Sequence, residues 1–255
     1  MIKELSAPET TTARIEFTVW NHTVRAQIPV PAGPARRSDL LPACRALTDL
    51  LVEVAVEAAS ERGEQISCKT GCGACCRQLV PVSEPEARRL ADLIEQLPDP
   101  RRSEIRARFA AASERLAAAG LLEKLADVER FPYDEMIPFG TDYFNLGIAC
   151  PFLENESCSI YSERPLICRE YLVTSPAVHC GSPTAATIRT VPLPGRASNA
   201  LNRVGLRRGA THVRWVPLVL APEWADANPA EPAEQQGPEM LKELFANLTE
   251  RRKQT

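Results

Sequence analysis

The sequence predicts a mixed α+β protein that is mainly helical and loop-rich, with an N-terminal β-hairpin and a core organised around a cluster of cysteines. Three observations predict this fold. Two runs near the N-terminus alternate apolar and polar residues, and several later stretches place apolar residues at helical spacing. The third observation is composition, because the 255 residues include 22 prolines and nine cysteines, eight of which fall between Cys68 and Cys180.

The N-terminal elements follow from apolar periodicity. Residues 13–30 predict a hairpin, with Asn21 and His22 as its turn. Residues 38–61 predict an amphipathic helix that starts at a capping Ser38 or Asp39. Cys44 falls on the apolar face of that helix, so we expect a buried core thiol there and not a metal ligand.

The later elements are more broken. A capping-box spacing, Ser83 to Glu86, predicts the start of a second helix. Further helices are expected over residues 101–119, within 120–130 and over 238–252. Residues 131–158 have the aromatic, proline and glycine content of a long ordered loop, and residues 228–237 read as a flexible linker.

These elements predict three parts. Residues 1–62 form the N-terminal hairpin and helix, packed on the main domain. Residues 63–182 form a cysteine-cluster domain, and residues 183–255 form a proline-rich C-terminal extension with a terminal helix. We interpret the densest basic stretch, Arg203, Arg207, Arg208 and Arg214, as solvated or acid-paired surface.

Charge and hydropathy limit the partners. The 30 basic residues against 33 acidic ones give a net charge of −3, which excludes a chain-wide basic footprint for nucleic acid. No signal peptide is visible, and no apolar run approaches the ~20 residues that span a bilayer. We therefore expect a cytoplasmic protein without a membrane partner. Structural disulfides are rare in that reducing compartment, so clustered cysteines there favour metal or redox chemistry.

The first cysteine cluster reads Cys68-Lys-Thr-Gly-Cys72-Gly-Ala-Cys75-Cys76-Arg77. Its two glycines let the backbone turn tightly, so several sulfur atoms can approach one point. The Cys72-x-x-Cys75 spacing lets two thiolates bind one tetrahedral ion. This cluster therefore predicts metal ligands.

The second cluster is more widely spaced. Its cysteines are Cys150, Cys158, Cys168 and Cys180, and we expect a short helix to run from Ser162 through Cys168. Ligands drawn from a loop, a turn and a helix would suit such spacing. The predicted metal ligands are Cys68, Cys72, Cys75, Cys76, Cys150, Cys158, Cys168 and Cys180.

Basic residues flank both clusters. Four thiolates around Zn²⁺ carry a net charge of about −2, and a cysteine-bound iron–sulfur cluster is likewise anionic. Such a centre is stabilised by nearby cations, and Arg77, Arg164 and Arg169 are the candidates to surround it. Zinc and iron both accept four thiolates, so the cofactor is zinc or iron, the latter including an iron–sulfur cluster. Eight ligands suffice for one cluster with spare thiols or for two separate sites.

The chain resembles the YkgJ-type cysteine-cluster family, described as a zinc- or iron-chelating domain. The resemblance covers roughly residues 65–182. It rests on Cys72-Gly-Ala-Cys75-Cys76-Arg77, on Cys150-Pro-Phe-Leu, and on Cys158-Ser-Ile-Tyr161-x-x-Arg164-Pro165-x-x-Cys168-Arg169. The family pattern is C-x-x-C-x-x-C-C, and Cys68 lies one residue farther from Cys72 than that pattern places it. The resemblance implies metal chelation and no particular reaction.

Three functions stay open. The first is a metal-binding protein, without an assignable catalytic activity, in which both cysteine segments converge on a zinc or iron–sulfur centre and a protein partner uses the remaining surface. The second is an iron–sulfur-dependent enzyme, because flagellin lysine methylases carry a similar cysteine cluster; Tyr161, Arg164 and Tyr171 would then line its pocket. The third is a thiol-redox protein using Cys75 and Cys76, which strained disulfide geometry between adjacent cysteines disfavours.

Overall fold

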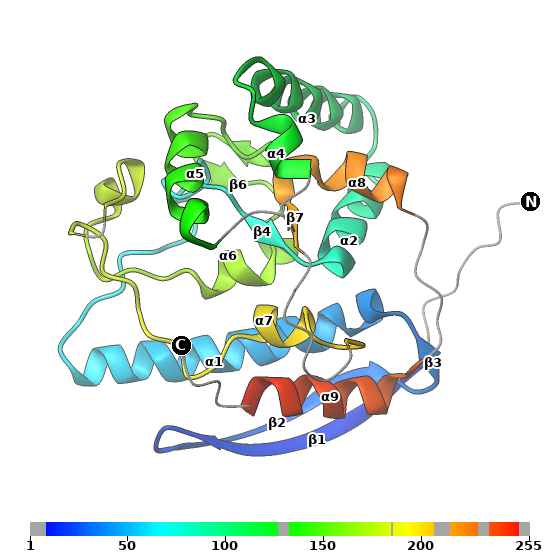
Figure 1. The fold of residues 1–255 in the computed structure, drawn as a ribbon. Coiled ribbons are helices and arrows are strands. Elements are labelled where there is room, and N and C mark those ends of the chain that lie inside the picture. Colours follow the sequence, from blue (N-terminus) through cyan, green and yellow to red (C-terminus); the bar gives the residue numbers. More distant parts are fainter. Residues whose placement is uncertain (1–8, 127–132, 185, 207–214, 229–234, 250–255) are drawn as a thin grey trace, which may run out of the picture.

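The computed structural model describes residues 9–126, 133–184, 186–206, 215–228 and 235–249. In Figure 1 a long β-hairpin and the C-terminal helix α9 (Gly237–Thr249) form one layer, and helices α1 (Leu41–Glu61) and α7 (Ala197–Leu201) lie directly above them. The other helices and the cysteine-bearing loops lie on the far side of α1. This arrangement confirms the predicted helix-rich α+β class. Within the described residues, no helix has both the length and the apolar character needed to cross a membrane.

The hairpin pairs β1 (Thr10–Val19) with β2 (His22–Pro31) in antiparallel register. The predicted turn at Asn21-His22 is wrong by one residue. Val19 pairs with His22, so Trp20 and Asn21 make the turn, and Trp20 adopts a positive φ of 48°. His22 is a strand residue whose Nδ1 lies 3.5 Å from Glu57 Oε2 on α1. The exposed Trp20 is not one of the residue types that typically mark a turn, so the sequence concealed the true turn.

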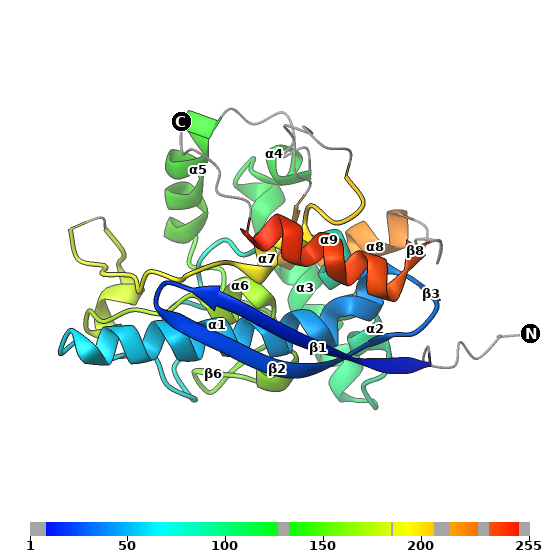
Figure 2. The same cartoon turned by 90° about the horizontal axis from the view of Figure 1, so that it is seen from below.

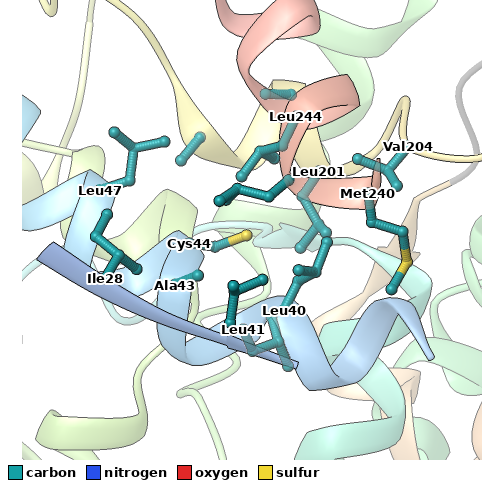
Figure 3. Close-up of a cluster of buried hydrophobic side chains, with 14 of the residues drawn as sticks. Ile28, Leu40, Leu41, Ala43, Cys44, Leu47, Leu201, Val204, Met240 and Leu244 are labelled. Atoms are coloured by element: carbon teal, nitrogen blue, oxygen red, sulfur yellow. The ribbon is translucent and has the colours of Figure 1, made fainter. Parts of the chain in front are cut away.

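Helix α1 (Leu41–Glu61), preceded by the 3₁₀ turn η1 (Arg37–Leu40), confirms the helix expected over residues 38–61. One face of the hairpin packs on α1, α7 (Ala197–Leu201) and α9 (Gly237–Thr249), as the view from below in Figure 2 makes clear. These elements share one hydrophobic core (Figure 3). Cys44 lies in it, with no exposed surface, between aliphatic side chains from both ends of the chain.

A second core lies on the other side of α1. The capping box of Ser83 and Glu86 starts α2 (Glu84–Glu95), as predicted. Helix α2 packs with α3 (Arg101–Ala118), α8 (Ala221–Ala227) and the small sheet formed by β4 (Pro81–Val82) and β7 (Val216–Pro217). The 3₁₀ turn η5 (Leu218–Leu220) joins β7 to α8.

The expectation of a continuous loop over residues 131–158 is wrong. A helix, α5 (Tyr133–Asn145), occupies much of that stretch and follows the short α4 (Leu122–Ala126). Phe139 and Tyr143, one helical turn apart, are both buried against α3 and η5. Proline and glycine within residues 138–140 are poor helix formers, so the local sequence conceals a helix that tertiary packing stabilises.

The segment from Ser162 to Cys168 is not one helix. A 3₁₀ turn, η3 (Tyr161–Glu163), is separated from α6 (Leu166–Glu170) by Arg164 and Pro165, both of which are extended. The ring of a proline disfavours helical backbone in the residue before it, and this explains the break at Arg164.

The C-terminal part of the chain returns to its beginning. The dipeptide β8 (Gln235–Gln236) pairs with β3 (Pro34–Ala35), so the predicted flexible linker over residues 228–237 ends in a strand that leads directly into α9. Residues 229–234 of that linker, and Arg207, Arg208 and Arg214 of the basic stretch, lie outside the described residues.

Candidate metal centre

All eight cysteines predicted as ligands line one cavity of about 140 Å³. They come from both cysteine segments, which are separated by more than seventy residues in the chain. The thiols on its wall are those of Cys68, Cys72, Cys75, Cys76, Cys150, Cys158, Cys168 and Cys180. Cys44 is not part of the wall, consistent with its place in the core of Figure 3.

The first cysteine segment is a series of tight turns. Cys72 N donates to Lys69 O at 3.1 Å, and Cys76 N donates to Gly73 O at 2.9 Å. Gly71 adopts a φ of +84°, which favours glycine, and this reverses the chain between Cys68 and Cys72. Successive turns thus place four thiols of one short segment on the same cavity.

The second segment meets the first through a small hairpin. Strands β5 (Leu153–Glu154) and β6 (Ser157–Cys158) are joined by Asn155 and Glu156, which have φ values of 49° and 57°. Positive φ at both central residues is typical of a type I′ turn. A Cβ atom on Gly73 would lie only 2.7 Å from the Glu156 carbonyl oxygen, so glycine is needed for the two segments to touch.

Helix α6 carries Cys168 and is anchored by two buried carboxylates. Glu86 Oε1 accepts a hydrogen bond of 2.7 Å from Leu166 N in the first turn of α6, and its other oxygen accepts from Ser83. Glu170, at the end of α6, accepts two hydrogen bonds from Ser198, and its carboxylate is 3.6 Å from the guanidinium of Arg196. Burial is the main cause that raises the pKa of Glu170.

The third wall of the cavity is the chain that leaves α6. Val173 N donates to Cys68 Sγ at 3.3 Å, and Ser67 N donates to Val173 O at 2.9 Å. The same strand-like segment continues into the 3₁₀ turn η4 (Ala177–Gly181), which carries the buried Cys180. Cys68 therefore packs against the segment that leads to Cys180.

The thiols differ in acidity. A hydrogen bond from Cys76 lowers the pKa of Cys75 to about 7, against an opposing effect of burial. The same hydrogen bond and burial raise the pKa of Cys76. Burial also raises the pKa of Cys150 to about 12 and that of Cys180 to about 11. One thiolate can therefore form near neutral pH without a metal, whereas most of the others need a cation to displace the proton.

The three flanking arginines have different surroundings. Arg77 makes a bidentate ion pair with Glu156, with distances of 3.0 and 2.6 Å, and Arg169 contacts Asp49 at 3.0 Å. Arg164 instead lies over the ring of Tyr161, 4.2 Å from its centroid. Its Nε is buried and has no hydrogen-bond partner in the described part of the chain. Arg164 also lowers the pKa of Cys68, Cys75 and Cys158, so its charge acts on the cavity.

The cavity fits a thiolate-bound metal in its chemistry. Its wall supplies soft sulfur donors, and the unpartnered Nε of Arg164 is a donor suited to an anionic sulfur. Across the described ranges, however, no three histidine, cysteine or carboxylate side chains converge closely enough to form a preassembled site. Metal binding would therefore have to draw thiols inward from the wall.

Sequence reasoning missed the anchors of the site. Glu86 was evident only as a helix cap, yet it also holds α6 from a position 80 residues away. Its hydrogen bonds, with only 5% of the residue exposed, identify it as structural support. The only sequence signal for this anchoring role was the position of the glutamate in a capping box, next to the apolar face of the helix.

The cysteine-bearing part of the chain matches a known family model. Residues 67–186 match the model of the CxxCxxCC family, described as "Putative zinc- or iron-chelating domain". Searches of curated proteins and of solved structures found no match. The match includes every cysteine that lines the cavity and excludes Cys44. Over residues 67–186, the chain is thus similar to the CxxCxxCC family of zinc- or iron-chelating cysteine-cluster domains.

Proposed function

We propose that this protein binds a zinc or iron–sulfur centre in the cavity, with thiolate ligands from both cysteine segments. The observation that carries the proposal is the presence of eight thiols, from both cysteine segments, on the wall of one cavity. Apolar cores do not gather thiols among glycine turns, and thiolates are preferred ligands of zinc and of iron–sulfur clusters.

The flanking cations support an anionic centre. We assign the role of charge partner to Arg164, because Arg77 and Arg169 already pair with the carboxylates of Glu156 and Asp49. A metal bound here would cross-link α6, the β5–β6 hairpin and the first cysteine segment. Zinc would supply structural stability or Lewis acidity, whereas an iron–sulfur cluster would supply electron transfer. A reducing compartment, which we propose to be the cytoplasm, would keep the thiols available.

Anaerobic purification followed by metal and sulfide analysis tests the proposal. We expect tightly bound zinc, or iron with acid-labile sulfide and visible charge-transfer absorption. Cys158→Ser should lower metal content, and Cys44→Ala is the matched control because its thiol lies outside the cavity. Failure of the reduced, metal-free protein to take up zinc, cobalt or iron with sulfide would contradict the proposal.

An iron–sulfur-dependent enzyme is the second candidate. The cavity is bordered by apolar side chains such as Val80 and Leu218 as well as by thiols, and the half-exposed Tyr161 lies at its edge. Such a border could hold an organic substrate beside a cluster. If the protein is such an enzyme, adding its substrate should change the absorption spectrum of the cluster. Tyr161→Phe should keep the metal content of the wild type but alter this substrate-induced spectral change.

A further inference from the structure

The long β-hairpin forms a sheet of two strands with two free edges. Across the described residues, β1 pairs with β2 alone, and β2 pairs with β1 alone. Glu9 O accepts a hydrogen bond of 2.7 Å from Ala32 N, so the odd-numbered residues of β1 bond toward β2. Bonding direction alternates along a strand, so the even-numbered residues point their N–H and C=O groups away from β2. The outward positions on β1 are Thr10, Thr12, Arg14, Glu16 and Thr18.

The two edges differ in how they are protected. Pro29 lies opposite Thr12 and Pro31 lies opposite Thr10, so β2 has no N–H at these two outward positions. Prolines on an edge strand hinder another chain from pairing with it. Strand β1 contains no proline and no lysine, and it pairs one to one with β2 without a bulge. The edge of β1 is therefore open to an added strand, whereas prolines interrupt the edge of β2.

The inner face of β1 leaves apolar surface uncovered. Ala13, Ile15, Phe17 and Val19 pack against the core shared with α1 and α9 but are only half-buried. The ring of Phe17 lies 5.5 Å from that of Phe245 on α9, measured between centroids. Neighbouring strands bring side chains of the same face into contact. Apolar side chains of an added strand would therefore cover the exposed part of this face.

The outer face of β1 carries opposite charges two residues apart. Glu16 accepts two hydrogen bonds from Arg25 of β2, at 3.0 and 3.2 Å. Arg14 lies opposite the uncharged Gln27 and makes no ion pair among the described residues. Both Arg14 and Glu16 are exposed. A strand added beside β1 would thus meet an available guanidinium at one outward position and a carboxylate at the next.

A second copy of the chain is a poor fit to this edge. Antiparallel pairing of two copies through β1 would place a twofold axis at the edge, and that axis would bring a second α9 beside the first. Helix α9 already lies along β1, as the contact between Phe17 and Phe245 and the view in Figure 2 show. A short extended segment of another protein brings no such helix.

We propose that β1 binds an extended segment of a partner protein, which adds antiparallel to β1 as a third strand of the hairpin sheet. Backbone hydrogen bonds to the outward groups supply affinity in this mode of recognition, and alternate side chains supply specificity. The segment alternates apolar with polar residues and places an acidic residue opposite Arg14 and a basic residue opposite Glu16. Strand β1 contributes no residue to the wall of the cysteine cavity, so this proposal does not depend on metal binding.

Hydrogen exchange of the anaerobically purified, full-length protein, read by NMR, tests the proposal. The probe is the end-capped peptide Thr-Val-Lys-Val-Glu-Val-Thr, whose first residue would pair with Thr18 and whose glutamate would pair with Arg14. The matched control peptide exchanges its lysine and glutamate. We expect the probe to slow exchange at outward amides such as those of Arg14 and Glu16 and to leave inward amides such as that of Ile15 unchanged. The probe should bind roughly tenfold more tightly than the control peptide, in which both cross-strand charge pairs are repulsive.

Three variants locate the site on β1. Arg14→Glu should abolish the preference between the peptides, because each peptide then meets one like charge and one opposite charge. Thr12→Pro removes an outward N–H without removing a hydrogen bond to β2, so it should weaken binding of both peptides. Gln27→Pro is its matched control, because it removes an outward N–H from β2, and it should leave binding unchanged.

The outcomes are decisive without any variant. Equal affinity of the two peptides for the wild-type chain, or unchanged exchange at Arg14 and Glu16 with the probe at millimolar concentration, would overturn the proposal. A concentration-dependent dimer whose outward β1 amides are protected without peptide would show that a second copy occupies the edge, and this would overturn the assigned partner. None of these results bears on metal content, which tests the proposed function separately.

Discussion

Gly73→Ala should separate the two cysteine segments without removing a ligand. The added Cβ would lie 2.6 Å from Leu153 Cδ1, 2.7 Å from Glu156 O and 2.9 Å from Glu156 C. The leucine methyl can rotate away. The Glu156 carbonyl cannot move as easily, because it belongs to a two-residue turn whose φ values are already positive. The backbone of the hairpin or of the cysteine segment must therefore shift.

The expected cost follows from two opposing effects. Overpacking of a fitted site costs about 1–3 kcal/mol. Replacement of glycine by alanine reduces the entropy of the unfolded chain and returns about 0.4–1 kcal/mol. The free energy of unfolding should therefore fall by about 1–2 kcal/mol. For a chain of this size each 1 kcal/mol lowers Tm by roughly 2–4 °C.

Thermal unfolding of the metal-loaded protein, with chelator competition for metal affinity, measures both effects. Gly181→Ala is the matched control, because it adds a methyl beside Cys180 where nothing lies within 4 Å. We expect Gly73→Ala to lower both Tm and metal affinity and Gly181→Ala to change neither. Equal behaviour of the two variants would show that close contact between the segments does not govern the site.

Four further predictions follow from the same contacts. Cys44→Ala should destabilise the protein by about 1 kcal/mol, as a small core truncation, and leave metal content unchanged; a loss of metal would place Cys44 at the centre. Arg164→Gln should weaken metal binding in chelator competition, whereas Arg77→Gln should have less effect because Arg77 already pairs with a carboxylate; the reverse order would refute the role of the buried unpaired nitrogen. Glu86→Gln should cost about 1–3 kcal/mol in urea unfolding, because one buried N–H at the start of α2 or α6 loses its acceptor; an unchanged midpoint would contradict the anchoring of α6. Removal of metal should increase hydrogen exchange in residues 67–76 and leave the β1–β2 hairpin protected; equal protection of residues 67–76 in both states would mean that metal does not stabilise this segment.

The sequence predicted the elements whose apolar periodicity matches their packing. The hairpin, α1, α2 and α3 lie close to their expected bounds, because each buries one regular face. Helix α5 was missed, since its burial of Phe139 and Tyr143 depends on α3 and η5 and its local propensity is poor. The break at Arg164–Pro165 was predictable, because proline disfavours a helical backbone in the residue before it. The expected helix instead started at Ser162 and extended through the proline.

The chemistry of the site was more predictable than its surroundings. Residue type and turn-forming glycines were enough to identify the candidate thiols. The partners of the arginines were not predictable, because Asp49 and Glu156 lie 120 and 79 residues from the cations that they bind. Spacing along the chain carries no information about such distant pairs, so Arg164 could not be distinguished from Arg77 and Arg169.

The core in Figure 3 joins the two ends of the chain, and this has a consequence for synthesis. Side chains from Ile28 to Leu47 complete that core only with Ala197 to Leu244, so it cannot close until α9 has left the ribosome. All eight cavity cysteines emerge earlier, by Cys180. Leu166, two residues before Cys168, also packs in this late core. A nascent chain therefore exposes its full set of thiols before the core that supports α6 is in place.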